Sequence, residues 1–135
     1  MNNVNFGPYL DSLDGLVRKA CAHLEGNLDE EQIELYDLAF VQAELLAART
    51  LISQTEQTAR LLPVCQFFCA NAIVTITQKF AVRPQTFGLT AAELPSLDAL
   101  QDFLAPQAIA ALGRQYLDQG LVDDSLDDEK RIIRD

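Results

Sequence analysis

The N-terminal part of the chain has the apolar spacing of an amphipathic α-helix. Its apolar residues recur at steps of three or one, which places them on one helix face: Leu10, Leu13, Leu16, Val17, Ala20, Cys21 and Leu24. Pro8 fits the first turn of such a helix, and Gly26 is a typical terminator. The sequence therefore predicts a first helix between these two residues.

A second helix is predicted to follow and to run to about Gln54. It starts near Asn27 or Asp29, because Asp29 and Gln32 have the spacing of a capping box and acidic residues fill the first turn. No Gly or Pro interrupts residues 32–54. Its small side chains would let a neighbouring helix approach closely: Ala39, Ala43, Ala47 and Ala48.

A third helix is predicted to be central, because its sequence is apolar on nearly every side. It begins between Thr58 and Leu62, since Pro63 is tolerated only in the first turn, and it ends before Pro84. The β-branched run 73–77 also suits a strand, but no partner strand is predicted elsewhere. If the helix is central, Phe68→Ala should cost about 3–5 kcal/mol.

After the third helix, the chain up to Gly120 is predicted to form an irregular connection and short helices. Residues 82–95 form an irregular connection in which Thr90 and Glu93 have capping-box spacing. Ser96 would cap a short helix over residues 97–105, and Pro106 would start another that Gly120 ends. The sequence thus predicts an all-α fold: an antiparallel helical bundle of three long helices plus two or more short ones, formed by residues 1–120.

The last residues, 121–135, differ from this bundle domain. Ser125 is a good N-cap followed by acidic residues, so a helix starts here, but no Gly or Pro ends it before Asp135. We interpret this segment as a linker and the start of a helix that leads into a further domain. Its apolar residues form a candidate docking surface: Leu126, Ile132 and Ile133.

Length and charge narrow the range of partners. The chain has 135 residues, enough for one domain with a core, and 49% of them are apolar, which argues against disorder. Asp and Glu number 20 against 10 Lys and Arg, so the formal net charge is −10. Because phosphate binding needs clustered basic residues, we expect neither nucleic acid nor a membrane as a partner.

The expected cellular compartment follows from the lack of a signal peptide and of a membrane-spanning segment in the sequence. The N-terminal residues have neither the basic start nor the apolar stretch of a signal peptide, and no segment is apolar for long enough to span a bilayer. Three cysteines is an odd number, which favours reduced thiols. We therefore expect a cytoplasmic protein.

Few residues suit catalysis. His23 is the single histidine, which excludes a di-iron bundle with two Glu-x-x-His pairs. A zinc site would need Cys21, Cys65 and Cys69 beside it, but such cysteines are more often small core residues. The acidic runs lie at predicted helix starts, where they favour the helix dipole, and no phosphate-binding loop or nucleophile motif is present. The residues alone predict a non-catalytic module with no catalytic, cofactor-binding or metal-binding residue.

Two stretches of the chain carry a family resemblance. The first is S-L-D-D-E-K-R-I-I-R-D, Ser125 to Asp135, and the second is E-Q-I-E-L-Y-D-L-A-F-V-Q-A-E-L-L-A-A-R, Glu31 to Arg49. The first resembles the opening of the first helix of the acyl-CoA dehydrogenase fold. The second is similar to the helical region ahead of the catalytic core in longer members of that family, such as the methylsuccinyl-CoA dehydrogenase type.

The resemblance implies a position within a larger flavoenzyme. The chain would be its N-terminal helical extension, with a docking or oligomerisation role against the catalytic core or a neighbouring subunit. The parent would use FAD to dehydrogenate an acyl-CoA thioester between its α and β carbons. The catalytic glutamate and the flavin and CoA contacts of the family lie in the core, so no such residue is assigned here.

Two other interpretations stay open. One is a free-standing acidic interaction protein, such as a chaperone or adaptor, whose apolar helices pair across a homo-oligomer. The other is a ligand carrier or enzyme with a pocket between helices, lined by Phe67, Phe68, Phe80, Cys65 and Cys69.

Overall fold

The fold is all-α, as the sequence predicts. The computed structural model describes residues 4–26, 32–54 and 59–119, and these contain no strand. The α-helices are α1 (Gly7–Leu24), α2 (Gln32–Gln54), α3 (Leu62–Val82), α4 (Gln101–Leu104) and α5 (Pro106–Gln119). Four 3-10 turns join them: η2 (Ala59–Leu61), η3 (Pro84–Phe87), η4 (Ala91–Glu93) and η5 (Asp98–Leu100).

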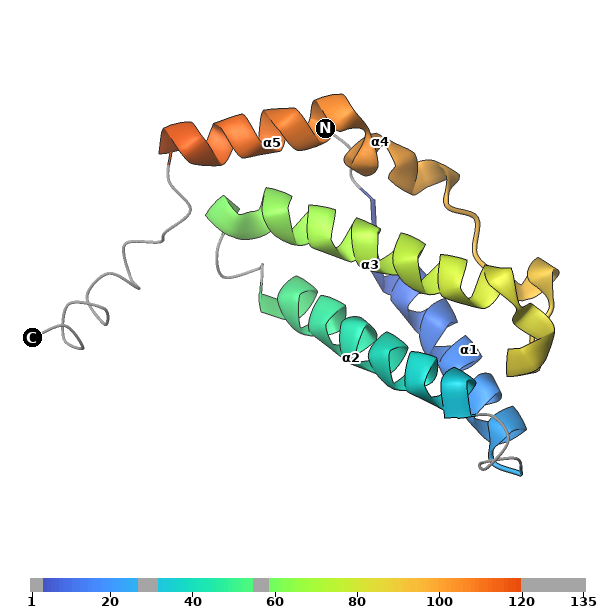
Figure 1. The fold of residues 1–135 in the computed structure, drawn as a ribbon. Coiled ribbons are helices and arrows are strands. Elements are labelled where there is room, and N and C mark those ends of the chain that lie inside the picture. The colour runs from blue at the N-terminus through green and yellow to red at the C-terminus, as the bar shows by residue number, and fades with distance from the viewer. Residues whose placement is uncertain (1–3, 27–31, 55–58, 120–135) are drawn as a thin grey trace, which may run out of the picture.

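The three long helices form the body of an antiparallel bundle. Figure 1 shows α2 and α3 side by side and running in opposite directions, with α1 behind them. The α5 helix returns antiparallel to α3, so its C-terminal end lies over the start of α3. The predicted caps of the second helix, the predicted end at Gly120 and all of residues 121–135 lie outside the described residues.

The predicted apolar face of α1 is the face that the bundle buries. Leu10, Leu13, Leu16, Val17, Ala20 and Leu24 are all buried. Pro8 lies in the first turn, as expected, because the missing N–H of proline costs nothing there. Phe6 precedes the helix and is also buried, with its ring 5.6 Å from the ring of Phe103.

The α2 helix packs through one of the four expected alanines, Ala48, and through larger apolar residues. Its buried residues are Leu38, Val41, Leu45 and Ala48. Ala48 lies close enough to α3 for the Cys69 thiol to donate a hydrogen bond to its carbonyl oxygen at 3.4 Å. Ala39 and Ala43 are exposed, so the prediction of close approach there is wrong. Ala39 lies one position beyond buried Leu38 and Ala43 two positions beyond buried Val41. At 3.6 residues per turn, these steps rotate the two alanines by about 100° and about 200° about the helix axis, which takes them off the contact face.

The α3 helix is central, and it is helical throughout its β-branched run. It contacts α1, α2 and α4, and the Thr77 hydroxyl donates to the Ile73 carbonyl oxygen at 2.7 Å. Ile73, Ile76 and Phe80 have no exposed surface. Phe68 is 36% exposed, so the expected large cost of Phe68→Ala is not supported. The reason is that a small bundle leaves one side of its middle helix uncovered even where the sequence there is apolar.

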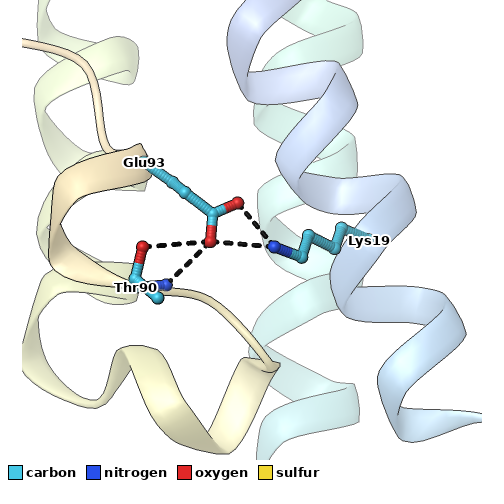
Figure 2. A network of polar contacts seen from close by, with 3 residues as sticks. All are labelled: Lys19, Thr90 and Glu93. Carbon is cyan, nitrogen blue, oxygen red and sulfur yellow. Dashed lines mark hydrogen bonds and ion pairs between the residues drawn. The ribbon is translucent and has the colours of Figure 1, made fainter.

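The connection between α3 and α4 is fixed by a carboxylate. The Glu93 Oε1 atom accepts hydrogen bonds from the Thr90 N–H and hydroxyl, each at 3.1 Å, which is the predicted capping-box pairing. Lys19 on α1 donates to both Glu93 oxygens at 2.8 and 2.7 Å, as Figure 2 shows. Ser96 does not cap the next helix as expected, because Leu97 is the N-cap of η5 and no side chain caps it.

The Glu93 network gives a test by pH. Its hydrogen bond from Lys19, helped by those from Thr90, holds the pKa of the Glu93 carboxyl below its usual range. A carboxyl whose pKa is lower in the folded state stabilises the fold above its unfolded pKa, and this stability is lost as pH falls through the lowered value. We expect Glu93→Gln to flatten the acid limb of stability, measured by urea unfolding from about pH 7 to about pH 3. Glu25→Gln, at the exposed end of α1, is the control, and equal acid limbs in wild type and Glu93→Gln would contradict the prediction.

Candidate functional site

The expected docking residues cannot be placed by the fold. Leu126, Ile132 and Ile133 lie outside the described residues, so their role stays a prediction. Such residues, or those of another protein, would meet the bundle at one of the surfaces that its described helices expose.

The cysteines and the histidine do not form a reactive site. Cys65 and Cys69 are buried on α3. Burial raises the pKa of the Cys65 thiol, and it raises that of Cys69 to about 12. Since the thiolate is the nucleophile and metal ligand, both thiols are unreactive at neutral pH. Among the described residues, no group of three or more His, Cys, Asp or Glu side chains could hold a metal ion.

The residues proposed to line a ligand pocket are not brought together by the fold. Phe80 is fully buried against Phe87, with ring centroids 5.1 Å apart in an edge-on arrangement. Cys65 and Cys69 are also in the interior, whereas Phe68 is partly exposed. Phe67 is one of the residues that line a surface groove described below.

An apolar groove lies between the first half of α3 and α5. We call it the α3–α5 groove, and its volume is about 330 Å³. Its lining is Val64, Phe67, Ile109, Leu112, Gly113, Tyr116 and Leu117. A second hollow of about 260 Å³ shares Phe67 and Leu112 with it and extends toward Phe103 of α4. This second hollow is more polar, because Gln66, Asp102 and Gln115 contribute to its lining.

The groove exists because α5 is attached to the bundle at its two ends. At one end it follows α4, which packs on α3. At the other end the Tyr116 hydroxyl donates to the Arg60 carbonyl oxygen at 2.8 Å. Between these attachments, Gly113 carries no side chain, and a Cβ built there would meet no atom within 4 Å. The space that a side chain at 113 would occupy is therefore open.

The groove is suited to apolar groups. Ile109 is 42% exposed and Leu117 is 84% exposed at its edge. The one polar side chain in its lining, Tyr116, already donates its hydroxyl hydrogen to Arg60. It has no charged side chain in its lining, so its chemistry favours aliphatic or aromatic side chains of a protein.

A second apolar surface covers the outer side of α2. Ile33, Tyr36 and Phe40 are exposed there, and the Tyr36 and Phe40 rings lie 4.8 Å apart. The Lys79 ammonium of α3 lies 5.7 Å from the centre of the Phe40 ring. The i, i+3, i+7 spacing of these residues could have revealed this stripe in the sequence, because it lies off the buried face of α2.

Ion pairs surround this second surface. The Arg83 guanidinium lies 3.6 Å from Glu34 and 3.9 Å from Asp37, and Lys79 lies 3.9 Å from Glu44. Lys79 belongs to α3, Arg83 follows its last residue, and all three carboxylates belong to α2, so the pairs join the C-terminal part of α3 to α2. Each is partly exposed, and such pairs contribute little to stability.

A polar hollow between α1 and α2 is less promising as a binding site. Its volume is about 350 Å³, and Arg18 and Arg49 contribute to its lining. The Arg49 guanidinium donates to Asp11 at 2.8 Å and to Asp14 at 3.1 Å. Because two carboxylates already neutralise Arg49, this side chain joins α1 to α2 and is not free for an anionic ligand.

Comparison with known proteins adds no assignment. No family model, curated protein or solved structure matches the chain. Within the described residues, no helix combines the length and the apolar character that crossing a membrane requires. The groove and the α2 surface are therefore the features on which a functional interpretation rests.

Proposed function

We propose that this chain is a non-catalytic helical docking domain. The observation that carries the proposal is the α3–α5 groove, where Leu117 is 84% exposed beside a strip of apolar side chains. Exposed apolar side chains beside an apolar groove are typical of surfaces that another protein segment covers. The buried, protonated thiols of α3 offer no nucleophile that would support an enzymatic alternative.

The proposed partner is the catalytic core of an acyl-CoA dehydrogenase-like flavoenzyme, or a neighbouring subunit of it. This part of the proposal rests on the resemblance of Glu31–Arg49 and Ser125–Asp135 to that family. In such a parent, the core would hold FAD and remove hydrogen from the α and β carbons of an acyl-CoA thioester. The present domain would contribute contacts with the core, with Leu126, Ile132 and Ile133 as docking residues. The three free cysteines are compatible with the cytoplasm as its compartment.

The reading frame after Asp135 tests the parentage. We expect several hundred further codons, with a region of predicted β-strands between helical regions, because the family places its middle β domain there. A stop codon directly after Asp135 would overturn the proposed parent enzyme. It would leave the docking role itself to the sedimentation and NMR experiments described below.

The second candidate is a free-standing acidic interaction protein, a chaperone or adaptor that acts as a homo-oligomer. The α2 surface of Ile33, Tyr36 and Phe40 favours it, because aromatic residues are enriched at protein interfaces. Sedimentation of the purified chain distinguishes the two. A dimer that dissociates after Phe40→Glu supports the second candidate, whereas a monomer at all concentrations counts against it.

A further inference from the structure

We infer that the α3–α5 groove is the receiving site for this chain's own segment 121–135, with Leu126 and Ile133 as the side chains that enter it. The inference deepens the proposed docking function and rests on it. It names the surface of the described bundle that is used and the segment that occupies it.

The position of the groove is the first argument. The groove runs along α5 from Ile109 to Leu117, so one of its ends lies near the C-terminal end of this helix. The chain leaves α5 at Gln119, so the segment that follows starts within one turn of the groove. Gly120 comes next in the sequence, and glycine at this position favours a reversal of chain direction.

The spacing of apolar residues is the second argument. Ile109 and Leu117 mark the two ends of the groove along α5 and are separated by about 12 Å at 1.5 Å per residue. Leu126 and Ile133 are seven positions apart in the sequence. In the helix that the sequence predicts from Ser125, they share one face and lie about 10 Å apart. Two side chains of this segment therefore match the length of the groove.

The shape of the groove favours a protein segment over a small molecule. It is an open strip whose edge residue Leu117 is 84% exposed. Small-molecule sites, in contrast, enclose most of the ligand surface. An amphipathic helix laid in an apolar groove buries such a strip along its length.

Covalent connection favours the chain's own segment over a second copy. A segment joined by a short flexible linker has an effective concentration in the millimolar range, well above the concentration of a typical protein sample. A second copy would make the same apolar contacts, but its binding would also cost the entropy of free translation and rotation. With equal contacts, the segment that follows α5 occupies the groove first.

The inference also gives the proposed docking its geometry. If the helix from Ser125 is the first helix of a catalytic core, as the resemblance implies, then the groove is where the bundle meets that core. The bundle would be held against the first turns of the core rather than connected to it by a free linker.

Gly113→Leu in the full chain provides the decisive variant. A Cβ at Gly113 meets no atom within 4 Å, and leucine is a far better helix former than glycine, so α5 should tolerate the change while the new side chain fills the groove. Gly15→Leu is the matched control, because Gly15 is also an exposed helical glycine with open space around it and lies on α1.

The measurement is NMR on methyl-labelled protein together with amide hydrogen exchange. In the wild type we expect cross-relaxation between the Ile133 methyls and the Phe67 ring, and protected amides in residues 126–135. Gly113→Leu should remove the cross-relaxation and lower amide protection in 126–135 about tenfold or more, whereas Gly15→Leu should leave both unchanged.

Each other outcome overturns the inference. Absence of the Ile133–Phe67 contact in the wild type shows that the segment does not use the groove, and its persistence in Gly113→Leu shows that it lies elsewhere. Contact seen between differently labelled molecules in a mixed sample shows that a second copy is the occupant. These outcomes are independent of the test of the proposed parent enzyme. The reading frame can continue after Asp135 although the segment does not occupy the groove, and the segment can occupy the groove although the reading frame stops.

Discussion

Phe80→Ala is expected to lower the free energy of unfolding by about 3–5 kcal/mol, whereas Phe68→Ala should lower it by about 1 kcal/mol. Both phenylalanines belong to α3, but Phe80 has no exposed surface and Phe68 is 36% exposed. Phe80 also contacts the Phe87 ring edge-on at 5.1 Å, so its removal leaves a cavity and an unpartnered ring. Chemical denaturation followed by far-ultraviolet circular dichroism measures both values.

The pair of variants serves as its own control for helix propensity. Each replaces phenylalanine by alanine within the same helix, so the gain in helix propensity is the same in both. The difference between them therefore reports the environment of each ring. Equal losses would show that the outer side of α3 is covered, contrary to the exposure of Phe68.

Gly88→Ala is expected to lower the free energy of unfolding by about 2–3 kcal/mol, combining two effects. Gly88 has φ of +71°, a left-handed conformation that costs a non-glycine residue about 1–2 kcal/mol. In addition, a Cβ at this position would lie 2.6 Å from Cγ of His23 and 2.8 Å from its Cβ. The backbone after α3 therefore passes directly against the last turn of α1, and an added methyl group must push the two apart.

A double-mutant cycle with His23→Gly separates the two effects. Removing the whole His23 side chain should recover the steric part of the loss caused by Gly88→Ala but not the part due to φ. Gly15→Ala, in open space on α1, should instead stabilise the protein slightly, by about 0.5–1 kcal/mol. A Gly88→Ala variant as stable as the wild type, or more stable, would contradict the close contact between Gly88 and His23.

The sequence predicts the helices well because local signals specify them. Pro8, Pro63 and Pro84 each mark a boundary through the same missing N–H and fixed φ, and the structure has helix ends close to all three. The capping-box spacing of Thr90 and Glu93 is likewise a local signal, and the pairing is present. The helical boundaries could therefore be derived without knowing how the helices pack.

What the sequence could not specify depends on packing between distant residues. The exposure of Phe68 depends on which side of α3 lacks a neighbour, and the need for glycine at 88 depends on where the His23 ring lies. The groove has the same origin, since its lining joins residues of α3 to residues of α5 that are far away in the chain. Periodicity identifies the apolar face of each helix but not the gap that remains between two such faces.

The hydrogen bond between the Tyr116 hydroxyl and the Arg60 carbonyl oxygen has a consequence for local opening of the fold. The α5 helix contacts α4, and this bond joins it to the segment just before α3, whereas α1, α2 and α3 all contact one another. Elements with few packing contacts open from the native state at a lower free-energy cost than the core. We therefore expect α5 to open from the bundle while the three long helices stay folded, and amide hydrogen exchange would show this as weaker protection in α5 than in α3.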